Sequence, residues 1–367
     1  MSHSRLAEIA RQFVIEPEVA PAAAVAVAWR GEGGWESADG AAFANRRDNP
    51  DVGSAALFDL ASVTKPFVAL TVARLAHRGR LRLDSPLGEL LPEASGTTTG
   101  SASLLLLLSH RAGLQAHRTL FAPLLAGLPF DRAQAIAEIL QGRRPECLAA
   151  APRAGHPPIY SDLGYALVGL AVERVEGLPL DQVVDREVCA PLGLEVGSSR
   201  LLRSRYSDFA VRCMPTEVVP FRSGEVRGIV HDENAWALSG HALSGHAGLF
   251  GTALSVAHFG RALLDVFHAR SEAWLDASSL AALLAARPGG TLRAGFDGKS
   301  ADQSSAGSRP GARSFGHLGF TGTSLWCDPD ADRVMVLLSN RVCPTRNNPR
   351  IRAARPVVND ALFSFRA

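Results

Sequence analysis

A serine and a lysine three residues apart, in the segment LFDLASVTKPF, constrain this chain more than any other feature. Only two of its 38 basic residues are lysines, Lys65 and Lys299, and the others are arginines. An ammonium group can lose its proton inside a protein, whereas a guanidinium group cannot. A lysine at position 65 therefore indicates a site that needs an amine, and Ser62 is the nucleophile that this amine would activate.

The spacing of Ser62 and Lys65 suits a helix, because residues i and i+3 lie on one helical face. An apolar run from Phe67 to Leu75 predicts such a helix, and Asp59 and Ser62 offer cap chemistry at its start. A helix N-terminus favours negative charge that develops on an oxygen. The spacing also arises by chance, in which case Ser62 caps the helix and Lys65 is solvated.

A tyrosine, one of only three in the chain, supports the catalytic interpretation. Tyr160 begins the sequence Tyr160-Ser161-Asp162, just before an amphipathic stretch. A neighbouring lysine ammonium stabilises a phenolate, so Tyr160 is a candidate general base toward Ser62 or toward an attacking water. Lys65 and Tyr160 would then share the proton transfers.

A glycine-rich strand, FGHLGFTGTSLW at residues 315–326, is the third element. Its glycines allow a backbone to approach closely, and one of its N–H groups could complete an oxyanion hole. A lone histidine is usually a structural residue, but the position of His317 in this strand favours a functional role.

With these three motifs in this order, the chain resembles the serine β-lactamase and penicillin-recognising hydrolase superfamily. It is most similar to the class C-like branch, which also holds esterases and D-aminopeptidases, and the resemblance covers about residues 20–365. The resemblance implies an α/β, serine β-lactamase/DD-peptidase-like fold, in which an antiparallel sheet is flanked by helices and a mostly helical domain is inserted. Residues 1–83 and 236–367 would form the α/β domain, and residues 84–235 the helical domain.

The resemblance also implies roles for individual residues. Ser62 matches the acylated nucleophile, Lys65 its activating partner and Tyr160 the tyrosine base. The backbone N–H groups of Ser62 and Phe320 match the oxyanion hole. The positions implied to bind substrate are Asp162, His317 and Gly319.

Asp162 departs from the family pattern, which usually has asparagine there. An ionised aspartate only accepts hydrogen bonds, so Asp162 could anchor Lys65 but would leave a substrate amide oxygen without a donor. It would also hold Lys65 more firmly protonated. The aspartate at this position therefore argues against efficient β-lactam or peptide turnover and favours other acyl substrates. Alternatively, Asp162 only caps the following helix.

Two longer stretches, at 230–260 and 316–348, are similar to a bacterial subgroup that includes N-acetylmuramoyl-L-alanine amidases of cell-wall recycling and a low-molecular-weight penicillin-binding protein. The first stretch holds polar residues that could suggest a metal site: His231, Asp232, Glu233, His241 and His246. No zinc-site spacing is present, so we expect no metal and no cofactor. We predict a polar loop that partly lines the acyl site, followed by a helix that opens near Ser255.

Composition bears on partners and location. A net charge of +2 without a basic tail gives no sign of nucleic-acid binding. Five cysteines without a C-x-x-C motif indicate reduced thiols. The first 29 residues lack a basic segment followed by an apolar core, and the apolar run 104–108 is too short to span a bilayer. We therefore expect a cytoplasmic protein with a small-molecule substrate, no membrane partner and an oligomeric state that the sequence leaves open.

Three further elements are predicted from local patterns. Residues 21–29 and 35–43 read as a hairpin, and residues 356–365 as a closing helix. The Gly/Ser-rich stretch 288–314 reads as a mobile loop in which Lys299 is solvated.

The function predicted from these features is that of a serine acyl hydrolase. It would act through a Ser62 acyl-enzyme on an ester or amide, including a muropeptide derived from the cell wall. The alternative is a β-lactam or muropeptide sensor that is acylated, or merely binds, with little turnover.

Overall fold

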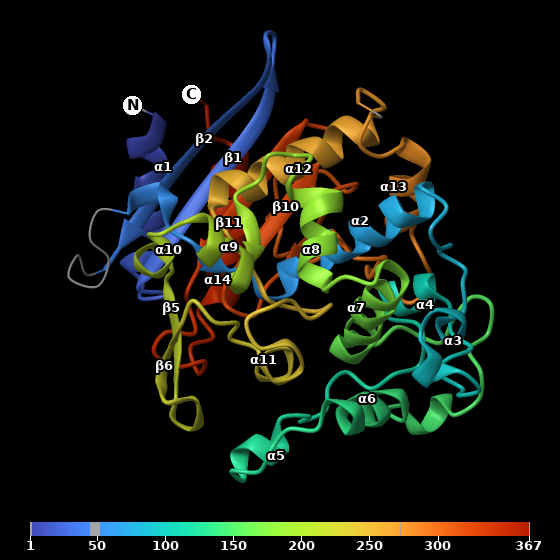
Figure 1. The fold of residues 1–367 in the computed structure, drawn as a ribbon. Helices are drawn as coiled ribbons and strands as arrows, with labels where there is room; N and C mark the ends of the chain where they lie inside the picture. Colours follow the sequence, from blue (N-terminus) through green and yellow to red (C-terminus); the bar gives the residue numbers. More distant parts are fainter. Residues whose placement is uncertain (1, 45–51, 272, 367) are drawn as a thin grey trace.

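The computed structural model describes residues 2–44, 52–271 and 273–366. Its centre is an antiparallel sheet of six strands in the order β2-β1-β11-β10-β9-β8 (Figure 1). The strands are β1 (Ala22–Gly31), β2 (Gly34–Phe43), β8 (Asp297–Gly298), β9 (Phe315–Leu318), β10 (Ser324–Asp328) and β11 (Arg333–Ser339). The two ends of the chain thus meet in one sheet, with β1 paired to β11. The predicted fold class is confirmed, as is the first hairpin.

Alternating side chains of the central strands are buried on both faces of the sheet. In β1, Ala24 and Ala26 pack in one hydrophobic cluster, whereas Val25 and Val27 pack in another. This two-residue alternation follows from the pleat of a strand. Helices α2 (Thr64–His77) and α12 (Ala253–Phe267) contribute to the first cluster, and α1 (Ser2–Ala10) and α14 (Ile351–Phe363) to the second.

The middle of the chain holds many short helices joined by loops. Its helices are α3 (Leu87–Leu90), α4 (Leu104–Leu108), α5 (Ala122–Leu125), α6 (Arg132–Leu140), α7 (Asp162–Glu176), α8 (Leu180–Val184), α9 (Ser199–Arg205), α10 (Phe209–Arg212) and α11 (Glu233–Ser239). Of these, α3, α4, α6 and α7 lie below and beside the sheet (Figure 1). Helix α13 (Ala277–Leu284) follows α12. The hydrophobic cluster of α2 and α12 continues into α4 and α7, so the helices of the middle region share one continuous core with the sheet.

Short strands also occur in this middle region. β4 (Val196–Ser198) joins β3 (Phe58–Asp59) and β7 (Leu249–Gly251) in a three-stranded sheet, and β5 (Pro215–Val219) pairs with β6 (Gly224–Arg227). Because β3 directly precedes Ser62, this small sheet ties the segment before the nucleophile to residues far along the chain.

Local predictions differ from the structure in three details, of which the closing helix is one of position only. The polar stretch at 230–250 contains helix α11, whose first turn is capped by the Asp232 side chain. The closing helix begins at Ile351 and carries Pro356 inside it. Lys299 is half-buried rather than solvated, and its ammonium donates to the carbonyls of Ser308 and Pro310. Within the described residues, no helix has the length and apolar character needed to cross a bilayer.

Candidate active site

Ser62 lies in a single 3₁₀ turn, Ala61–Val63, that leads directly into α2. The Asp59 carboxylate accepts the Ala61 N–H at 2.8 Å and the His231 N–H at 2.6 Å, which ties the turn to a distant segment. Ala61 adopts a left-handed φ of 47°, a conformation that costs energy for a residue with a side chain. The predicted cap is wrong for both residues, because Val63 is the N-cap of α2 and no side chain caps that helix, so the Ser62 hydroxyl is free for chemistry.

The turn between β9 and β10 packs directly on the nucleophile turn. The Thr321 and Thr323 hydroxyls donate to the carbonyls of Asp59 and Leu60. A Cβ at Gly319 would lie 1.9 Å from Thr323 Oγ1 and 2.6 Å from the Leu60 carbonyl oxygen, so only glycine fits there. The predicted close backbone approach in this motif is confirmed.

Lys65 is fully buried and its ammonium makes three hydrogen bonds. It donates to Ser62 Oγ at 2.8 Å, to Asp162 Oδ1 at 2.7 Å and to the His246 carbonyl oxygen at 3.2 Å. Burial alone would lower the pKa of Lys65, but Asp162 and Tyr160 together raise it above its ordinary value. Lys65 is therefore held as an ammonium ion in the resting site.

Tyr160 lies next to Lys65, with the centroid of its ring 4.8 Å from the Lys65 Nζ atom. Its hydroxyl lies close enough to Ser62 and Lys65 for both side chains to lower the pKa of the phenol. Burial raises the pKa of the phenol, and the charge of Lys65 opposes this only in part. Because Lys65 already donates to Ser62 Oγ, the Ser62 proton is free to point at the Tyr160 oxygen.

Asp162 begins α7, but the cap of that helix is Ser161, whose Oγ accepts the Gly164 N–H. The alternative that Asp162 merely caps the helix is therefore wrong. Its carboxylate instead reaches Lys65 and stays 23% exposed to the cavity.

Two buried histidines pack around Tyr160. The His110 ring lies 4.6 Å from the Tyr160 ring, and its Nδ1 accepts the Ser161 N–H at 3.0 Å. The His317 ring lies 6.0 Å from Tyr160, and its Nδ1 contacts the Leu318 carbonyl oxygen at 2.8 Å. Burial, together with the charge of Lys65, lowers the pKa of His317 to about 3 and that of His110 well below its ordinary value.

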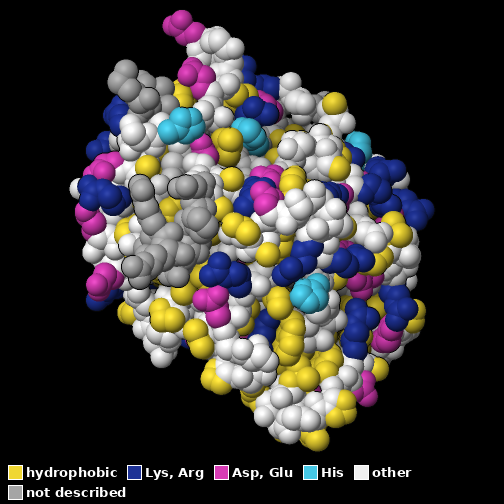
Figure 2. All heavy atoms as spheres, turned by 60° about the vertical axis from the view of Figure 1, so that its left-hand side comes forward, with side chains coloured by type: hydrophobic (Ala, Val, Ile, Leu, Met, Phe, Trp, Pro, Cys, Tyr) yellow, Lys and Arg dark blue, Asp and Glu magenta, His cyan; other side chains and the backbone are white. Residues whose placement is uncertain are grey.

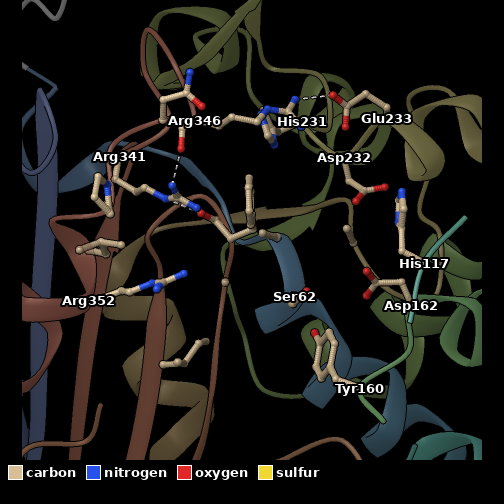
Figure 3. Close-up of a pocket in the computed structure, with 18 of the residues that line it drawn as sticks. Ser62, His117, Tyr160, Asp162, His231, Asp232, Glu233, Arg341, Arg346 and Arg352 are labelled. Atoms are coloured by element: carbon tan, nitrogen blue, oxygen red, sulfur yellow. Dashed lines mark hydrogen bonds and ion pairs between the residues drawn. The ribbon is translucent and has the colours of Figure 1, made fainter. Parts of the chain in front are cut away.

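A cavity of about 770 Å³ opens above Ser62 (Figure 3). Of the predicted site residues, Ser62, Tyr160, Asp162, Gly319 and Phe320 line it. Lys65 lies beneath the cavity, and His317 packs behind Tyr160, so contact of His317 with substrate stays a prediction. The backbone N–H groups of Ser62 and Phe320 make no hydrogen bond within the described part of the chain, as an oxyanion hole requires.

Opposite walls of this cavity differ in charge. Arg341 and Arg352 lie on one side of Ser62, and His117 and Asp232 on the other (Figure 3). The prediction that the 230–250 stretch partly lines the site is confirmed by His231, Asp232, Glu233 and Ala247, whereas exposed His241 is not among the lining residues.

The arginine wall is the part of the site that sequence reasoning missed. Arg346 is paired with Glu217 and Glu233, whereas Arg341 and Arg352 form no ion pair with any described carboxylate. Arg341 lies 4.4 Å from the Phe320 ring centroid and donates to the Phe320 carbonyl. The available signal was the density of arginines, five between positions 341 and 355.

Comparison with known proteins agrees with this architecture. Residues 12–359 match the family model named Beta-lactamase, and the chain therefore belongs to the β-lactamase family. It is 28% identical over 328 residues to a putative D-alanyl-D-alanine carboxypeptidase of Escherichia coli K12, covering 80% of this chain and 72% of that protein. It is likewise 28% identical over 321 residues to an N-acetylmuramyl-L-alanine amidase of Bacillus subtilis 168, covering 80% of this chain and 71% of the relative.

Solved structures share the fold at low sequence identity. A class C β-lactamase from Rhodobacter sphaeroides superposes with a TM-score of 0.69 at 19% identity, covering 98% of this chain and 99% of that one. EstCE1, a hydrolase with promiscuous acyltransferase activity, gives a TM-score of 0.66 at 21% identity, covering 96% and 98%. The names of the curated relatives place this chain among hydrolases.

Proposed function

We propose that this protein is a serine acyl hydrolase that forms an acyl-enzyme on Ser62. The observation that carries the proposal is the contact set of the Ser62 hydroxyl. Its oxygen accepts from the Lys65 ammonium and its proton can be passed to Tyr160. The backbone N–H groups of Ser62 and Phe320, both residues of the cavity wall, have no hydrogen-bond partner among the described residues. The proposal therefore assigns the nucleophile, the proton acceptor and the oxyanion donors to groups at the floor of one cavity.

The acylation step follows from these contacts. Ser62 Oγ bonds to the substrate carbonyl carbon while the carbonyl oxygen gains negative charge between the N–H groups of Ser62 and Phe320. Tyr160 takes the Ser62 proton as it passes its own phenol proton to the leaving nitrogen or oxygen. The bond to the leaving group then breaks. Lys65 stays cationic throughout and stabilises charge that builds on the Tyr160 oxygen.

In deacylation a water molecule takes the place of the leaving group, and the bond between Ser62 Oγ and the acyl carbon breaks. The water loses a proton to Tyr160, attacks the acyl carbon and releases the acid, while Tyr160 returns its proton to Ser62 Oγ. No proton is left over in the cycle, and no further reactant is needed.

The wall of Arg341 and Arg352 supports an anionic substrate. Buried Arg341 donates to the carbonyls of Phe320, Arg346 and Asn348, whereas Arg352 is exposed. Neither pairs with a described carboxylate, so their charge favours a ligand that brings its own carboxylate, which the Arg352 guanidinium can bind with paired hydrogen bonds. Peptide fragments of the cell wall carry free carboxylates and amide bonds. We therefore infer a muropeptide-like acyl donor, a class that fits the printed names of the carboxypeptidase and amidase relatives.

The alternative of a sensor that is acylated with little turnover is supported by one observation. The pKa values of both Lys65 and Tyr160 are raised, so neither group is a ready base toward water in the resting site. Slow deacylation would then leave Ser62 occupied.

A substrate panel with intact-mass detection tests both forms of the proposal. The enzyme is mixed with p-nitrophenyl acetate, nitrocefin and a muramyl peptide, and both product and Ser62 adduct are followed with time. Continued turnover supports the hydrolase, and a burst equal to the enzyme concentration followed by a stable adduct supports the sensor. No adduct and no product with any of the three would contradict acylation of Ser62.

A further inference from the structure

The third acceptor of the Lys65 ammonium is a backbone carbonyl from a distant part of the chain. The carbonyl oxygen of His246, in the segment between α11 and β7, lies 3.2 Å from the Lys65 Nζ atom. A backbone carbonyl can hold an ammonium in one place only if the backbone itself is held.

The His246 side chain is placed to do this. It is 2% exposed, and both of its ring nitrogens have partners. Nε2 lies 2.9 Å from Asp232 Oδ1, and Nδ1 lies 3.1 Å from Ser244 Oγ. A carboxylate can only accept, so Nε2 carries the proton and donates it to Asp232. The imidazole is therefore fixed at both ends.

The backbone on either side of His246 is equally constrained. Ser244 and Ala247 exchange two backbone hydrogen bonds, at 3.2 and 3.3 Å, which close a tight turn. Gly245 in that turn lies against α7, because a Cβ there would come within 1.8 Å of the Tyr165 carbonyl oxygen. The turn is thus packed against the helix whose first residue, Asp162, also holds Lys65.

The Asp232 side chain is also held in place by its own contacts. Its Oδ1 accepts the Ala235 N–H at 2.8 Å and so caps α11, and its side chain lines the cavity (Figure 3). Burial alone would raise the pKa of Asp232, but His246 lowers it below the ordinary value, so the carboxylate stays charged.

We propose that Asp232 and His246 are positioning residues for Lys65: their side-chain contact fixes the His246 carbonyl, which fixes the ammonium that contacts Ser62. The chain offers a comparison in His231, whose ring meets Glu217 at 2.9 Å and whose carbonyl accepts from Arg222. The same kind of pair there holds an arginine. At His246 it holds the candidate catalytic lysine. The proposed effect on rate rests on the proposed function, whereas the effect on Lys65 geometry does not.

The lysine content of the chain allows a direct test. With Lys65 and Lys299 as the only lysines, protein labelled with ¹³C and ¹⁵N at lysine gives two side-chain NMR signals, which Lys299→Arg assigns. The measured quantities are the Nζ chemical shift and its hydrogen-exchange rate, and neither requires a substrate. Lys299 serves as an internal reference, because its ammonium is bonded to the Ser308 and Pro310 carbonyls away from the cavity.

Four variants define the experiment. His246→Leu removes both ring contacts, Asp232→Ala removes the carboxylate, and Ser244→Ala removes only the Nδ1 contact. His268→Leu is the matched control. It removes a histidine that contacts the Pro329 carbonyl and Asp332 at the C-terminal end of α12. Thermal unfolding of each variant checks that it is folded. If His246→Leu does not fold, the Lys65 signal of Ser244→Ala is the one compared with wild type.

We expect His246→Leu and Asp232→Ala to shift the Lys65 signal and speed its Nζ exchange at least about tenfold, with Ser244→Ala intermediate and Lys299 unmoved. Ser62 acylation should fall by about tenfold to a hundredfold, the range for one hydrogen bond to a charged group. An unmoved Lys65 signal, or equal changes at Lys65 and Lys299, would overturn the proposal. A shifted Lys65 signal in a protein whose wild type never acylates Ser62 would support the positioning and contradict the proposed function.

Discussion

The Nζ atom of Lys65 lies 2.7 Å from Oδ1 of Asp162, a residue 97 positions further along the chain. This contact joins the N-terminal turns of α2 and α7 beneath the cavity. It also keeps Lys65 protonated, since Asp162 and Tyr160 outweigh the effect of burial on its pKa. In the resting site Lys65 is therefore a fixed cation, and under the proposed function Tyr160 is the group that exchanges protons with Ser62.

Replacing the nucleophile tests the assignment of Ser62. We expect Ser62→Ala to lose turnover of every substrate and to show no covalent adduct, while its melting temperature stays close to that of wild type. The Ser62 hydroxyl caps no helix, so its loss should leave the fold intact. Ser95→Ala, at an exposed serine, is the control. Undiminished hydrolysis by Ser62→Ala would end the assignment.

Lys65→Arg tests the need for an ammonium. The side chain is fully buried among three acceptors, and a planar guanidinium cannot meet all of them in the same space. We expect kcat to fall by at least about 10³-fold, as when a member of a catalytic unit is removed.

The only other lysine in the chain provides the matched control. Lys299→Arg makes the same chemical change outside the cavity and should leave kcat at its wild-type value. Wild-type kcat in Lys65→Arg would mean that any cation of roughly that length suffices.

Asp162→Asn tests the departure from the family pattern. The asparagine oxygen can still accept from Lys65, and its amide adds a donor toward the cavity. We expect the ratio of kcat/KM for nitrocefin to that for p-nitrophenyl acetate to rise by about tenfold to a hundredfold. An unchanged ratio would place Asp162 away from the substrate. A collapse of both activities would show that the site depends on the negative charge.

Stability should depend on pH through His317. Its pKa in the folded protein is lowered to about 3, whereas the unfolded chain binds a proton near the ordinary value of about 6.5. Between these values the unfolded state holds more protons, so this contribution to stability is complete above pH ~6.5 and is lost as the pH falls.

The slope for His317 is at most about 1.4 kcal/mol per pH unit. Wild type and His317→Gln are compared by denaturant unfolding between pH 4 and 7. The glutamine variant should show a shallower dependence, and His110 continues to contribute in both proteins. Equal slopes would mean that His317 titrates normally in the folded state.

Arg352→Gln tests the anionic substrate. Arg352 is exposed on the cavity wall and pairs with no described carboxylate, so its replacement should cost little stability. We expect kcat/KM for a carboxylate-bearing peptide substrate to fall about tenfold or more, with p-nitrophenyl acetate nearly unaffected. Equal losses on both substrates would argue against a carboxylate contact.

Much of the site can be read from the sequence because its motifs are local. Ser62 and Lys65 occupy one turn, and the need for glycine at position 319 follows from a backbone approach that tolerates no side chain. The motifs predicted the family, the resemblance to that family implied the fold class, and the local sequence predicted the first hairpin.

The sequence suggested that Asp162 would keep Lys65 protonated, but only the tertiary structure brings the charged groups of the site together. Asp162 and Tyr160, which raise the pKa of Lys65, come from about a hundred residues further along the chain, and the His246 carbonyl that also accepts from Lys65 comes from further still. The Arg341 and Arg352 wall and the Asp232 contact arise in the same way, from loops that only packing brings to one cavity. A sequence pattern specifies neighbours within a turn or strand, whereas burial and long-range contacts set which groups stay charged and what they face.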